Sequence, residues 1–439
     1  MEFNIALGMT GFVLVVLLVL MGMPIPWAMF LLGISGFVVL ANLDVSLPHL
    51  DGSTFWMSLS YSLAVLPLFV LMGMFAEASR IIEQIFNALS VVLRGVRGGL
   101  LHAVIAGSAI FAACTGSTLA SAATFSRISL RPLLEKKYNK YLAAGCIASS
   151  GTMAVMIPPS VAMVIFSILS DTSLGPLLIA GIIPGILNAI MLFGTIFGIA
   201  LVKPEWAPSS AEKTGLRERW IAIKNAPTGL FIVLLVVFVV GGIYIGYFTP
   251  TQAGAMGAFG TFIIYAIRWK KRSMGPVKLL NDAAIMSGKI FFILGSGVLF
   301  GRFLTMSGVV GASTNYISGL AIPPMAIVFM FVLLYLVLGQ FFTGTAMQVL
   351  TVPVVFPALA ALEFSPIWIG IIIVQLCELG TISPPLGMNV FGVAAASQGL
   401  VTADEVFKGA IPLMAVDLAL LLLIIFFPQL ALWLPSTMI

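Results

Sequence analysis

The sequence predicts an all-α integral membrane protein built as an inverted repeat, with two re-entrant hairpins and two discontinuous helices. Three observations predict this fold: an apolar composition, basic residues gathered in a few clusters, and a pair of helix-breaking motifs that occurs twice. Of the 439 residues, 60% are hydrophobic and 8% are charged, and the mean hydropathy is +1.15. This composition excludes a soluble domain with a polar surface.

Apolar runs along the chain approach or reach the roughly 20 residues that span a bilayer. With the shorter runs included, we expect roughly ten or more crossings or re-entrant segments. The first run lacks a basic flank and a second run follows it at once, so we expect a retained helix and no cleaved targeting segment. The main runs lie near 5–23, 26–40, 61–74, 227–247, 253–269 and 411–435.

The net charge of +5 and the pI near 9.1 do not indicate a nucleic-acid partner, because the basic residues follow the positive-inside rule. Asp44, Asp51, Asp171 and Glu363 stand in segments without Lys or Arg. We therefore expect the basic clusters in the cytoplasm, and both termini and residues 44–56 in the periplasm. The clusters are Arg80, Arg94 and Arg97; Arg127, Arg131, Lys136, Lys137 and Lys140; Lys203, Lys213, Arg217, Arg219 and Lys224; and Arg268, Lys270, Lys271, Arg272 and Lys278.

A pair of motifs occurs once in each half of the chain: Gly151 lies 36 positions after Thr115 in one half, and Gly380 lies 37 positions after Thr343 in the other. Glycine and paired prolines interrupt helices. Interrupted membrane helices at matching positions of two halves mark the binding site of a secondary transporter. The motifs are Thr115-Gly116-Ser117, Gly151-Thr152 and Pro158-Pro159, then Thr343-Gly344-Thr345, Gly380-Thr381 and Pro384-Pro385.

In the first half, residues 1–60 are expected to form N-terminal scaffold helices and 61–202 the first repeat. A helix over 61–78 precedes an amphipathic interfacial helix that begins near Arg80, since its apolar residues recur at helical spacing. The next apolar arms, 100–113 and 118–131, are too short for two ordinary crossings with an outer loop, which indicates a hairpin entering from the cytoplasm. A broken helix over 141–168 and a helix over 177–202 complete this repeat.

Residues 203–226 are expected to form a cytoplasmic linker, most of it a long polar loop. Residues 227–439 are expected to hold further scaffold helices and the second repeat. Because the parity of crossings differs, the second hairpin enters from outside, and the repeat is inverted. Its parts are an arm over 324–342, a tip at 343–345, a return over 349–362, a broken helix over 367–397 and a final helix from Ile411.

At a hairpin tip or a helix break, carbonyl oxygens lose their helical partners and, with Ser or Thr hydroxyls, form a neutral cage that suits Na⁺. The freed helix N-termini attract a carboxylate or another anion. A single motif of this kind is also explained by close helix packing or a simple kink. The matched duplication favours the ion site.

Several charged residues lie at membrane depth. Glu378, directly before the second break, could couple a proton or a cation, but we expect an ion pair with Arg302 or Lys289. Glu77, Asp417 and Lys289 could instead lie near an interface or bind a partner subunit, and we assign them no role.

Enzyme classes find no support in the sequence. It contains no Gly-x-x-x-x-Gly-Lys-Ser/Thr loop, and its histidines are His49 and His102 alone. Neither a metal hydrolase nor a serine nucleophile with a histidine base is expected. Transport would have to be driven by an ion gradient. Cys114, Cys146 and Cys377 lie in apolar segments and are interpreted as small core residues.

Over nearly its whole length the chain resembles the large membrane subunit of tripartite ATP-independent periplasmic (TRAP) transporters. Two departures from the family pattern stand out: Gln252 replaces a usual Glu, and Ala154 replaces a glycine in the first break. The resemblance rests on Pro67-Leu68-Phe69, Arg97-Gly98-Gly99-Leu100, the segment 110–117, the segment 151–160, the segment 180–185, Phe248-Thr249-Pro250-Thr251 and the segment 380–389.

The resemblance implies an elevator mechanism in a bacterial inner membrane, carrying Na⁺, with two ions expected, and an organic anion bound between the two hairpin tips. It implies two partners besides membrane lipid: a small four-helix membrane subunit and a soluble periplasmic substrate-binding protein. By position, sodium site 1 would use Thr115, Gly116, Ser117, Thr118, Gly151, Thr152, Pro158 and Pro159. Sodium site 2 would use Thr343, Gly344, Thr345, Gly380, Thr381, Ser383, Pro384 and Pro385.

A stand-alone sodium-coupled carboxylate symporter is the alternative, because it shares hairpins and broken helices but needs no binding protein. An ion channel or a membrane scaffold protein would explain the hydropathy, but not the repeated helix-breaking motifs. Which organic acid or sulfonate is carried does not follow from the sequence.

Overall fold

The computed structural model describes residues 2–40, 61–208 and 215–438 of the chain. Helices and short turns make up these ranges, and no strand occurs within them. The expected external segment 44–56 lies outside them, and so does Lys213 of the linker. The predicted all-α fold class is confirmed.

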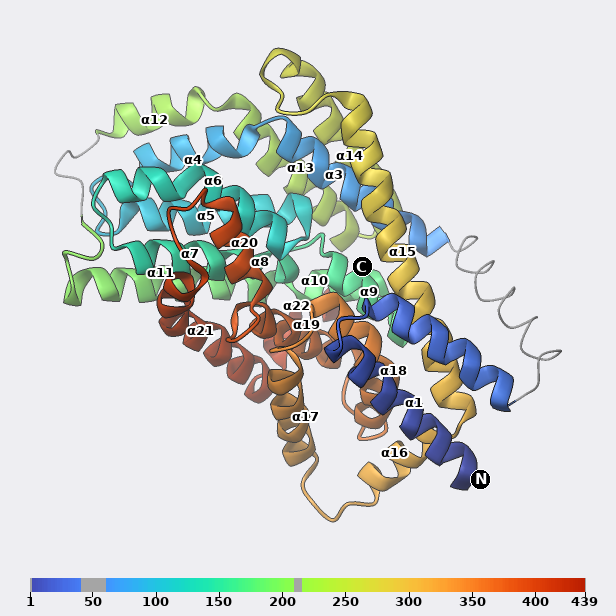
Figure 1. Ribbon diagram of the computed structural model, residues 1–439. Coiled ribbons are helices and arrows are strands. Elements are labelled where there is room, and N and C mark those ends of the chain that lie inside the picture. The colour runs from blue at the N-terminus through green and yellow to red at the C-terminus, as the bar shows by residue number, and fades with distance from the viewer. Residues whose placement is uncertain (1, 41–60, 209–214, 439) are drawn as a thin grey trace.

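The first half of the chain folds as helices joined by short connections (Figure 1). The bends and turns between them fall close to the predicted positions. In order they are α1 (Glu2–Leu20), a helix over Ile25–Leu40, the 3-10 turn η1 (Tyr61–Ala64), α3 (Val65–Ala78), α4 (Ile81–Val92), α5 (Gly99–Thr115), α6 (Thr118–Glu135), α7 (Lys140–Gly151), α8 (Met153–Met156), α9 (Val161–Ser170), α10 (Leu174–Ala180) and α11 (Ile182–Val202).

The second half of the chain, after the linker, also consists of helices joined by short turns. In order it contains α12 (Leu216–Lys224), α13 (Pro227–Tyr244), α14 (Pro250–Ile267), η2 (Trp269–Lys271), α15 (Pro276–Met306), α16 (Val309–Ser318), α17 (Pro324–Leu338), α18 (Gly344–Ala360), α19 (Pro366–Ile382), α20 (Met388–Ala396), α21 (Ala403–Phe426) and α22 (Gln429–Ser436). Helices α15 and α16 precede the second hairpin as α3 and α4 precede the first, a correspondence that the sequence did not reveal.

By length and composition, five helices of the described part can cross a membrane, or seven if each bent pair is one span. Helices α3 and α4 form one bent pair, at 63°, and α7–α8 with α9 form the other, at 44°. The second bend is the break expected at Pro158-Pro159. The five are α1, α10 with α11, α13, α15 and α21, and α5, α17, α18, α19 and Ile25–Leu40 are shorter apolar helices.

The expected amphipathic helix is present as α4, and its interfacial position stays a prediction. Its apolar face buries Ile81, Ile82, Ile85 and Phe86, while Glu83 on the opposite face is exposed. This segregation is typical of a helix that lies between apolar and aqueous surroundings.

A guanidinium group holds the bend between α3 and α4. Arg268, at the end of α14, donates from Nε to the Ser79 carbonyl at 2.6 Å and from Nη2 to the Arg80 carbonyl at 3.4 Å. It also donates from Nη1 to Gln84 Oε1 on α4, at 3.0 Å. Arginine presents several donors in a fixed fork, so one side chain satisfies carbonyls that the bend has freed.

Glycines let α14 approach its neighbours. Gly254 faces Phe69, Gly257 faces Met72, and a Cβ on Gly257 would lie 2.4 Å from the Met72 sulfur. The apolar run expected at 253–269 forms this helix, which packs closely against α3.

The linker differs from the expected polar loop, because part of it forms α12. The sequence Leu-Arg-Glu-Arg-Trp-Ile-Ala-Ile-Lys consists largely of good helix formers. The helix contacts α4, and Arg219 Nη2 donates to the Arg94 carbonyl at 3.5 Å. The linker thus lies against the amphipathic helix α4.

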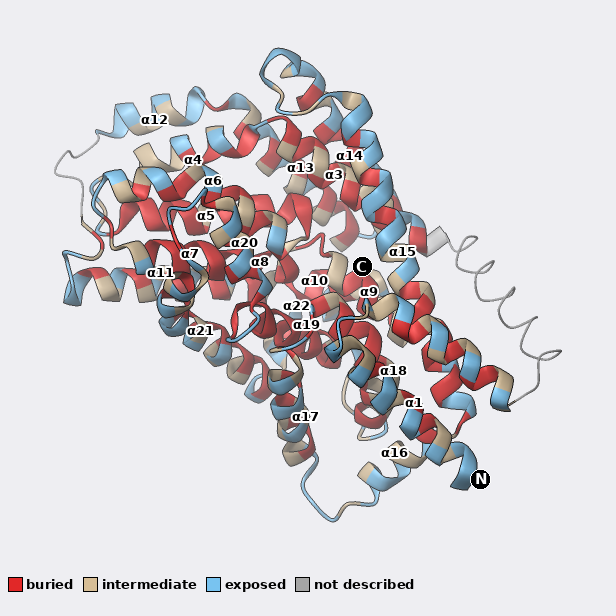
Figure 2. Cartoon of the chain, viewed as in Figure 1, coloured by how far each residue is buried: buried red, intermediate tan, exposed pale blue. Residues whose placement is uncertain are grey.

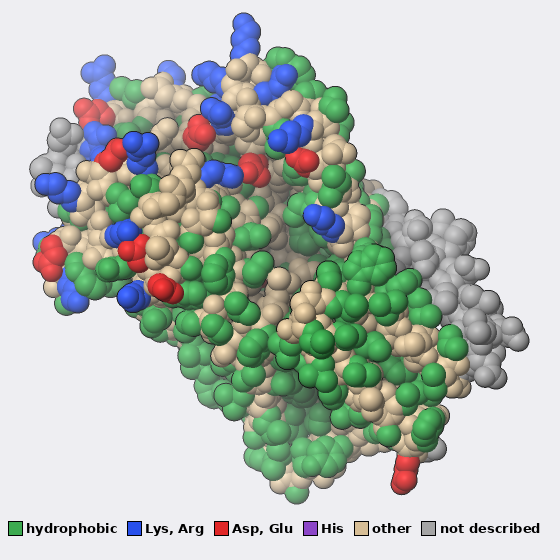
Figure 3. All heavy atoms as spheres, viewed as in Figure 1, with side chains coloured by type: hydrophobic (Ala, Val, Ile, Leu, Met, Phe, Trp, Pro, Cys, Tyr) green, Lys and Arg blue, Asp and Glu red, His purple; other side chains and the backbone are tan. Residues whose placement is uncertain are grey.

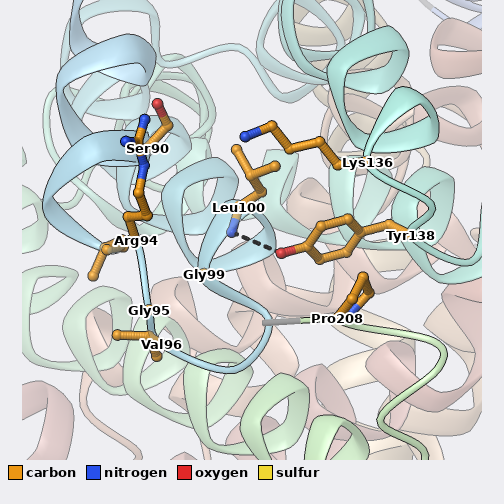
Figure 4. Close-up of a pocket in the computed structure, with 10 residues that line it drawn as sticks. Ser90, Arg94, Gly95, Val96, Gly99, Leu100, Lys136, Tyr138 and Pro208 are labelled. Atoms are coloured by element: carbon orange, nitrogen blue, oxygen red, sulfur yellow. Dashed lines mark hydrogen bonds between the residues drawn. The ribbon is translucent and has the colours of Figure 1, made fainter. Parts of the chain in front are cut away.

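The base of the first hairpin is fixed by a phenol. Tyr138, buried in the turn between α6 and α7, accepts a hydrogen bond from the Leu100 N–H at 3.3 Å, and so caps the N-terminus of α5 (Figure 4). Burial raises the pKa of this phenol, partly opposed by the Leu100 N–H. Arg94 and Lys136 stand at the same cavity of about 300 Å³.

Burial is greatest where the hairpins meet the broken helices. Figure 2 shows buried residues concentrated around α5, α7, α8, α10 and α19, with exposed residues on α12, α13 and α17. On the face seen in Figure 3, Lys and Arg gather at the end that carries α12 and α4, and hydrophobic side chains cover the end that carries α17 and the N-terminus. Such segregation is what the positive-inside rule requires, and which side is cytoplasmic stays a prediction.

Candidate functional site

Four helices begin at one partly open cavity, with a volume of about 210 Å³, lined by both polar and apolar residues. They are α6 and α9 from the first half and α18 and α20 from the second. Residues of α8, α15 and α19 close the remaining sides. The lining comprises Gly116, Ser117, Thr118 and Leu119; Val155; Val161 and Ala162; Met286 and Ile290; Thr343, Gly344 and Thr345; Glu378 and Thr381; and Met388 and Asn389.

The first hairpin rests directly on the first helix break. Gly116 is the turn residue, with φ of +57°, and a Cβ there would lie 2.8 Å from the Pro159 carbonyl oxygen. Ser117 then caps α6 by accepting the Ala120 N–H at 3.4 Å. Ser160 caps α9 in the same way by accepting the Met163 N–H at 3.3 Å. Glycine is required at this turn by both its backbone angle and the space available.

The second hairpin turns earlier than expected. Its arm ends at Leu338 rather than Phe342, and the turn occupies 339–342. Thr343 is the N-cap of α18 and accepts the Ala346 N–H at 3.3 Å, so Gly344 and Thr345 belong to the first helical turn. The predicted tip 343–345 is therefore wrong by a few residues.

This shift changes how the two triplets correspond. Thr115 ends α5, and its hydroxyl donates to the Phe111 carbonyl at 3.2 Å, whereas Thr343 begins α18. The structural counterpart of Thr343 is Ser117, since both cap the helix that leaves the hairpin. Thr115 and Thr343 therefore occupy different positions in the fold, although the two triplets have similar sequences.

The threonines of the two breaks make the same hydrogen bond. Thr152 Oγ1 donates to the Ser149 carbonyl at 2.7 Å, and Thr381 Oγ1 donates to the Glu378 carbonyl at 2.8 Å. Gly151 packs against the first hairpin, where a Cβ would lie 3.1 Å from the Thr118 carbonyl oxygen.

Several expected ligands do not line the cavity. The X-Pro bonds Pro158-Pro159 and Pro384-Pro385 are both cis. Ser383 Oγ donates to the Gly380 carbonyl at 3.2 Å. Gly380 touches the turn of the second hairpin, because a Cβ there would lie 2.6 Å from the Gly339 Cα. The residues outside the lining are Thr115, Gly151, Thr152, Pro158, Pro159, Gly380, Ser383, Pro384 and Pro385.

The ion pair expected for Glu378 does not form. Arg302 and Lys289 are exposed on α15, and neither lies within ion-pair distance of this carboxylate. Glu378 is 4% exposed and lines the cavity, with Oε2 3.4 Å from Thr381 Oγ1. It faces the site because α19 turns this side of the helix toward the hairpin.

Asp417 on α21 is the second buried carboxylate near a break. The Asn188 amide donates to its Oδ1 at 2.9 Å, and the Thr152 hydroxyl lies 3.4 Å from the same oxygen. Asp417 thus joins the last helix to the first break, although it stands far from it in sequence. Glu77, by contrast, pairs with Arg127 at 2.9 Å near the surface.

Asn389 is a cavity residue to which the sequence analysis gave no role. It is fully buried at the start of α20, and neither its amide nitrogen nor its amide oxygen has a hydrogen-bond partner among the described residues. Buried amides normally have partners, so this side chain is available to a ligand. An asparagine directly after a helix break in an apolar segment was the available signal.

The paired hairpins and broken helices around one cavity define a membrane transport protein. The chain belongs to the family described as tripartite ATP-independent periplasmic transporter, DctM component, which it matches over residues 12–430. The resemblance seen in the sequence is therefore confirmed.

Three relatives illustrate the family. The C4-dicarboxylate TRAP transporter large permease protein DctM of Pseudomonas aeruginosa is 30% identical, covering 92% of this chain and 93% of its own. The sialic acid TRAP transporter large permease protein SiaM of Vibrio cholerae is 27% identical, covering 94% and 95%. The isethionate TRAP transporter permease protein DctMQ of Oleidesulfovibrio alaskensis is 27% identical, covering 94% of this chain and 64% of its own.

Two solved structures share the fold at low sequence identity. MtrF of Neisseria gonorrhoeae, described among antimetabolite efflux pumps, has a TM-score of 0.58 at 13% identity, covering 89% of this chain and 86% of that one. The YdaH transporter of Alcanivorax borkumensis, described as having an unusual topology, has a TM-score of 0.60 at 12% identity, covering 88% and 89%. At these identities the likeness concerns the fold alone.

Proposed function

We propose that this protein takes up a small organic anion through the inner membrane by sodium symport, using a periplasmic binding protein and a small membrane subunit. The observation that carries the proposal is the convergence of four helix N-termini on one cavity. Each N-terminus offers free N–H groups and a positive partial charge, and together they favour an anion. No Lys or Arg lines the cavity, so the helix ends would supply this attraction.

Sodium coupling is supported by the carboxylates. Glu378 and Asp417 are buried, and among the described residues neither has a cationic partner. A buried unpaired carboxylate costs several kcal/mol, which a bound cation would offset. Each carboxylate lies beside the threonine of one break. Site 1 would accordingly be built around Thr152 and the first hairpin, and site 2 around Thr381 and the second.

An elevator movement is supported by the way that the broken helices are packed. Helices α7 and α21 touch backbone to backbone: a Cβ on Gly145 would lie 2.0 Å from the Gly409 carbonyl carbon. A Cβ on Gly409 would lie 1.8 Å from the Tyr141 carbonyl oxygen. Such contact does not allow one helix to slide past the other, so these elements of both repeats would move together against α3, α13 and α14.

The relatives named above are called transporters of C4-dicarboxylate, sialic acid and isethionate, all of them small organic anions. A carboxylate or sulfonate is therefore the proposed substrate class for this chain. Both groups accept several N–H hydrogen bonds at a helix N-terminus.

Uptake by proteoliposomes tests the proposal. Purified protein with its small subunit is reconstituted, and uptake of labelled organic acids is measured with and without an inward Na⁺ gradient and the binding protein. We expect uptake to need both. Sodium-driven uptake without the binding protein would instead favour the stand-alone symporter, and uptake indifferent to Na⁺ would contradict the ion sites.

A matched pair of variants tests the site itself. Thr381→Ala should raise the Na⁺ concentration for half-maximal uptake by about three- to tenfold, since one hydroxyl is worth about 1 kcal/mol. Thr261→Ala is the control, because Thr261 is equally buried and donates to the Gly257 carbonyl at 3.0 Å on α14, away from the cavity. Equal responses of both variants would contradict site 2.

A further inference from the structure

An open groove of about 460 Å³ lies between α7, α11 and α21. Helix α21 packs against both α7 and α11, and the three helices lie side by side (Figure 1). No residue of the groove lines the central cavity. The groove opens at the molecular surface, because Val202 in its lining is 80% exposed. It is therefore a second site, separate from the one that the hairpins form.

The groove has an apolar and rigid floor. Ile199 on α11 and Pro412 on α21 line it. At Gly409 the backbone of α21 touches α7, since a Cβ there would lie 1.8 Å from the Tyr141 carbonyl oxygen. Gly198 on α11 leaves open space instead, because a Cβ there would meet no atom within 4 Å. A hydrocarbon chain can therefore lie over Gly198.

Two ammonium groups line the same groove. Lys203 stands at the C-terminal end of α11, and Lys408 stands in the second turn of α21. The groove lining contains no Asp or Glu, and neither lysine has an ion pair within the described ranges. The nearby Glu405 is engaged by Lys140 at 2.8 Å. The positive charge of the groove is thus left for a ligand.

The aromatic side chain of the groove indicates where it lies in the membrane. Lys203 Nζ is 4.0 Å from the centroid of the Trp206 ring, and Trp206 lines the groove as well. Tryptophan and lysine are typical of the level of the lipid headgroups. Lys203 also belongs to a basic cluster that the sequence places on the cytoplasmic side, where the membrane surface is negative.

We propose that this groove binds an anionic phospholipid, with the phosphate at Lys203 and Lys408 and an acyl chain over Gly198. A phosphate oxygen accepts strong hydrogen bonds from ammonium groups, and basic pockets between membrane helices bind anionic headgroups. A soluble anion would leave the apolar floor uncovered, and an uncharged lipid would leave both lysines without a partner. An anionic phospholipid satisfies both parts of the groove.

The lipid would connect the two halves of the chain. Lys203 comes from the first half and Lys408 from the second, so a headgroup between them would stabilise the contact between α11 and α21. A ligand that binds only the folded state raises the thermal stability of the protein. This inference depends neither on the proposed sodium coupling nor on the transported substrate.

The test is thermal unfolding of the purified protein in detergent micelles titrated with dioleoyl phosphatidylglycerol. We expect a saturable rise of the unfolding temperature. Dioleoyl phosphatidylcholine should bind at least about fivefold more weakly, since its own ammonium group reduces the attraction to the lysines. Soluble glycerol phosphate should have no effect at the same concentration. An equal effect of either control compound would overturn the proposal.

A first pair of variants tests the charges. Lys203→Gln combined with Lys408→Gln should weaken the apparent affinity for phosphatidylglycerol at least tenfold, since each lysine contributes about fivefold. Lys224→Gln combined with Lys278→Gln is the control, because both lysines are exposed and lie outside the groove. Equal losses in the two double variants would show attraction by net charge alone and would overturn the site.

A second pair tests the floor of the groove. Gly198→Phe fills the space above α11 and should weaken phosphatidylglycerol binding about tenfold. Gly194→Phe, one turn earlier on the same helix, also enters open space but lies outside the groove lining, so it should change nothing. Because a Cβ at either glycine meets no atom within 4 Å, both variants should fold. Unchanged binding by Gly198→Phe would overturn the proposed position of the acyl chain.

Discussion

The two hairpin modules contain similar motifs but are assembled differently. In the first, the turn at Gly116 lies on the break itself, and the neighbouring carboxylate, Asp417, comes from the other half of the chain. In the second, the hairpin lies against intact helix before the break, and the carboxylate, Glu378, belongs to that same helix. The difference shows that duplicated motifs need not be assembled alike: the first proposed site would draw on both halves of the chain and the second on one.

The largest effect should come from Gly116 of the first hairpin, and the matching glycine of the second hairpin, Gly344, should have little effect. Gly116→Ala forces a side chain onto a left-handed residue and to 2.8 Å from the Pro159 carbonyl oxygen, which should cost about 2–4 kcal/mol and abolish uptake. Gly344→Ala meets atoms no closer than 3.4 Å in a helical turn and should leave uptake within about twofold. Uptake and thermal unfolding of both variants check this, and equal losses would remove the distinction between the modules.

The carboxylate of the second module should have the next largest effect. Glu378→Gln removes the charge that lines the cavity and should lower sodium-dependent uptake about tenfold, or about 1.4 kcal/mol. Ser149, which precedes Thr152 as Glu378 precedes Thr381, is uncharged and buried, so Ser149→Ala should change uptake less than about twofold. Uptake against Na⁺ concentration distinguishes the two. A large loss in Ser149→Ala would mean that the first module carries its own ligand at this position.

The caps test which residues truly correspond. Ser117→Ala and Thr343→Ala each remove an N-cap and should each cost about 1 kcal/mol of stability. Thr115→Ala, although the triplets pair it with Thr343, removes a bond within α5 and should cost less than about 0.5 kcal/mol. Chemical denaturation in a defined detergent measures all three. If Thr115→Ala lost as much stability as Thr343→Ala, Thr115 rather than Ser117 would be the counterpart of Thr343, as the sequence alignment of the two triplets suggests.

The smallest effect concerns the ion pair that joins the first hairpin to α3. Arg127 on α6 pairs with Glu77 on α3 at 2.9 Å, and the described part of the second hairpin has no such ion pair. Both side chains are more than a third exposed, so Arg127→Gln should cost at most about 1 kcal/mol, and less at high salt. Thermal unfolding at two ionic strengths measures it. A loss that is independent of salt would point to packing of the Arg127 stem.

The sequence predicted the structure best where the covalent geometry of the residues determines the backbone conformation. Paired prolines cannot continue a helix, so the breaks at Pro158-Pro159 and Pro384-Pro385 were predictable, as was the amphipathic α4 from its spacing. The predicted position of the second hairpin's turn was wrong because Thr343 caps α18 through a hydrogen bond that the sequence alone does not predict. The sodium ligands themselves stay a prediction.

The sequence did not predict which residues far apart in the chain contact each other in the fold. Asp417 and Thr152 are in contact although 265 positions separate them in the sequence, and the sequence around neither residue predicts this contact. Glu378 was expected to pair with a basic residue because an unpaired buried charge is costly, but α19 directs it into the cavity. The helix α12 was not predicted because the polar residues around it are typical of a loop, although the residues of the helix itself favour helix formation.

The guanidinium of Arg268 has a consequence for biosynthesis. It satisfies the carbonyls of Ser79 and Arg80 at the bend of α3 and α4, yet it is made 188 residues after Arg80. At about 5–20 residues per second, the ribosome needs roughly 10–40 s to produce that stretch. During this interval, water or lipid headgroups must donate hydrogen bonds to the carbonyl groups of the bend. The first half of the chain therefore reaches its final hydrogen bonding only after the second half has been synthesised.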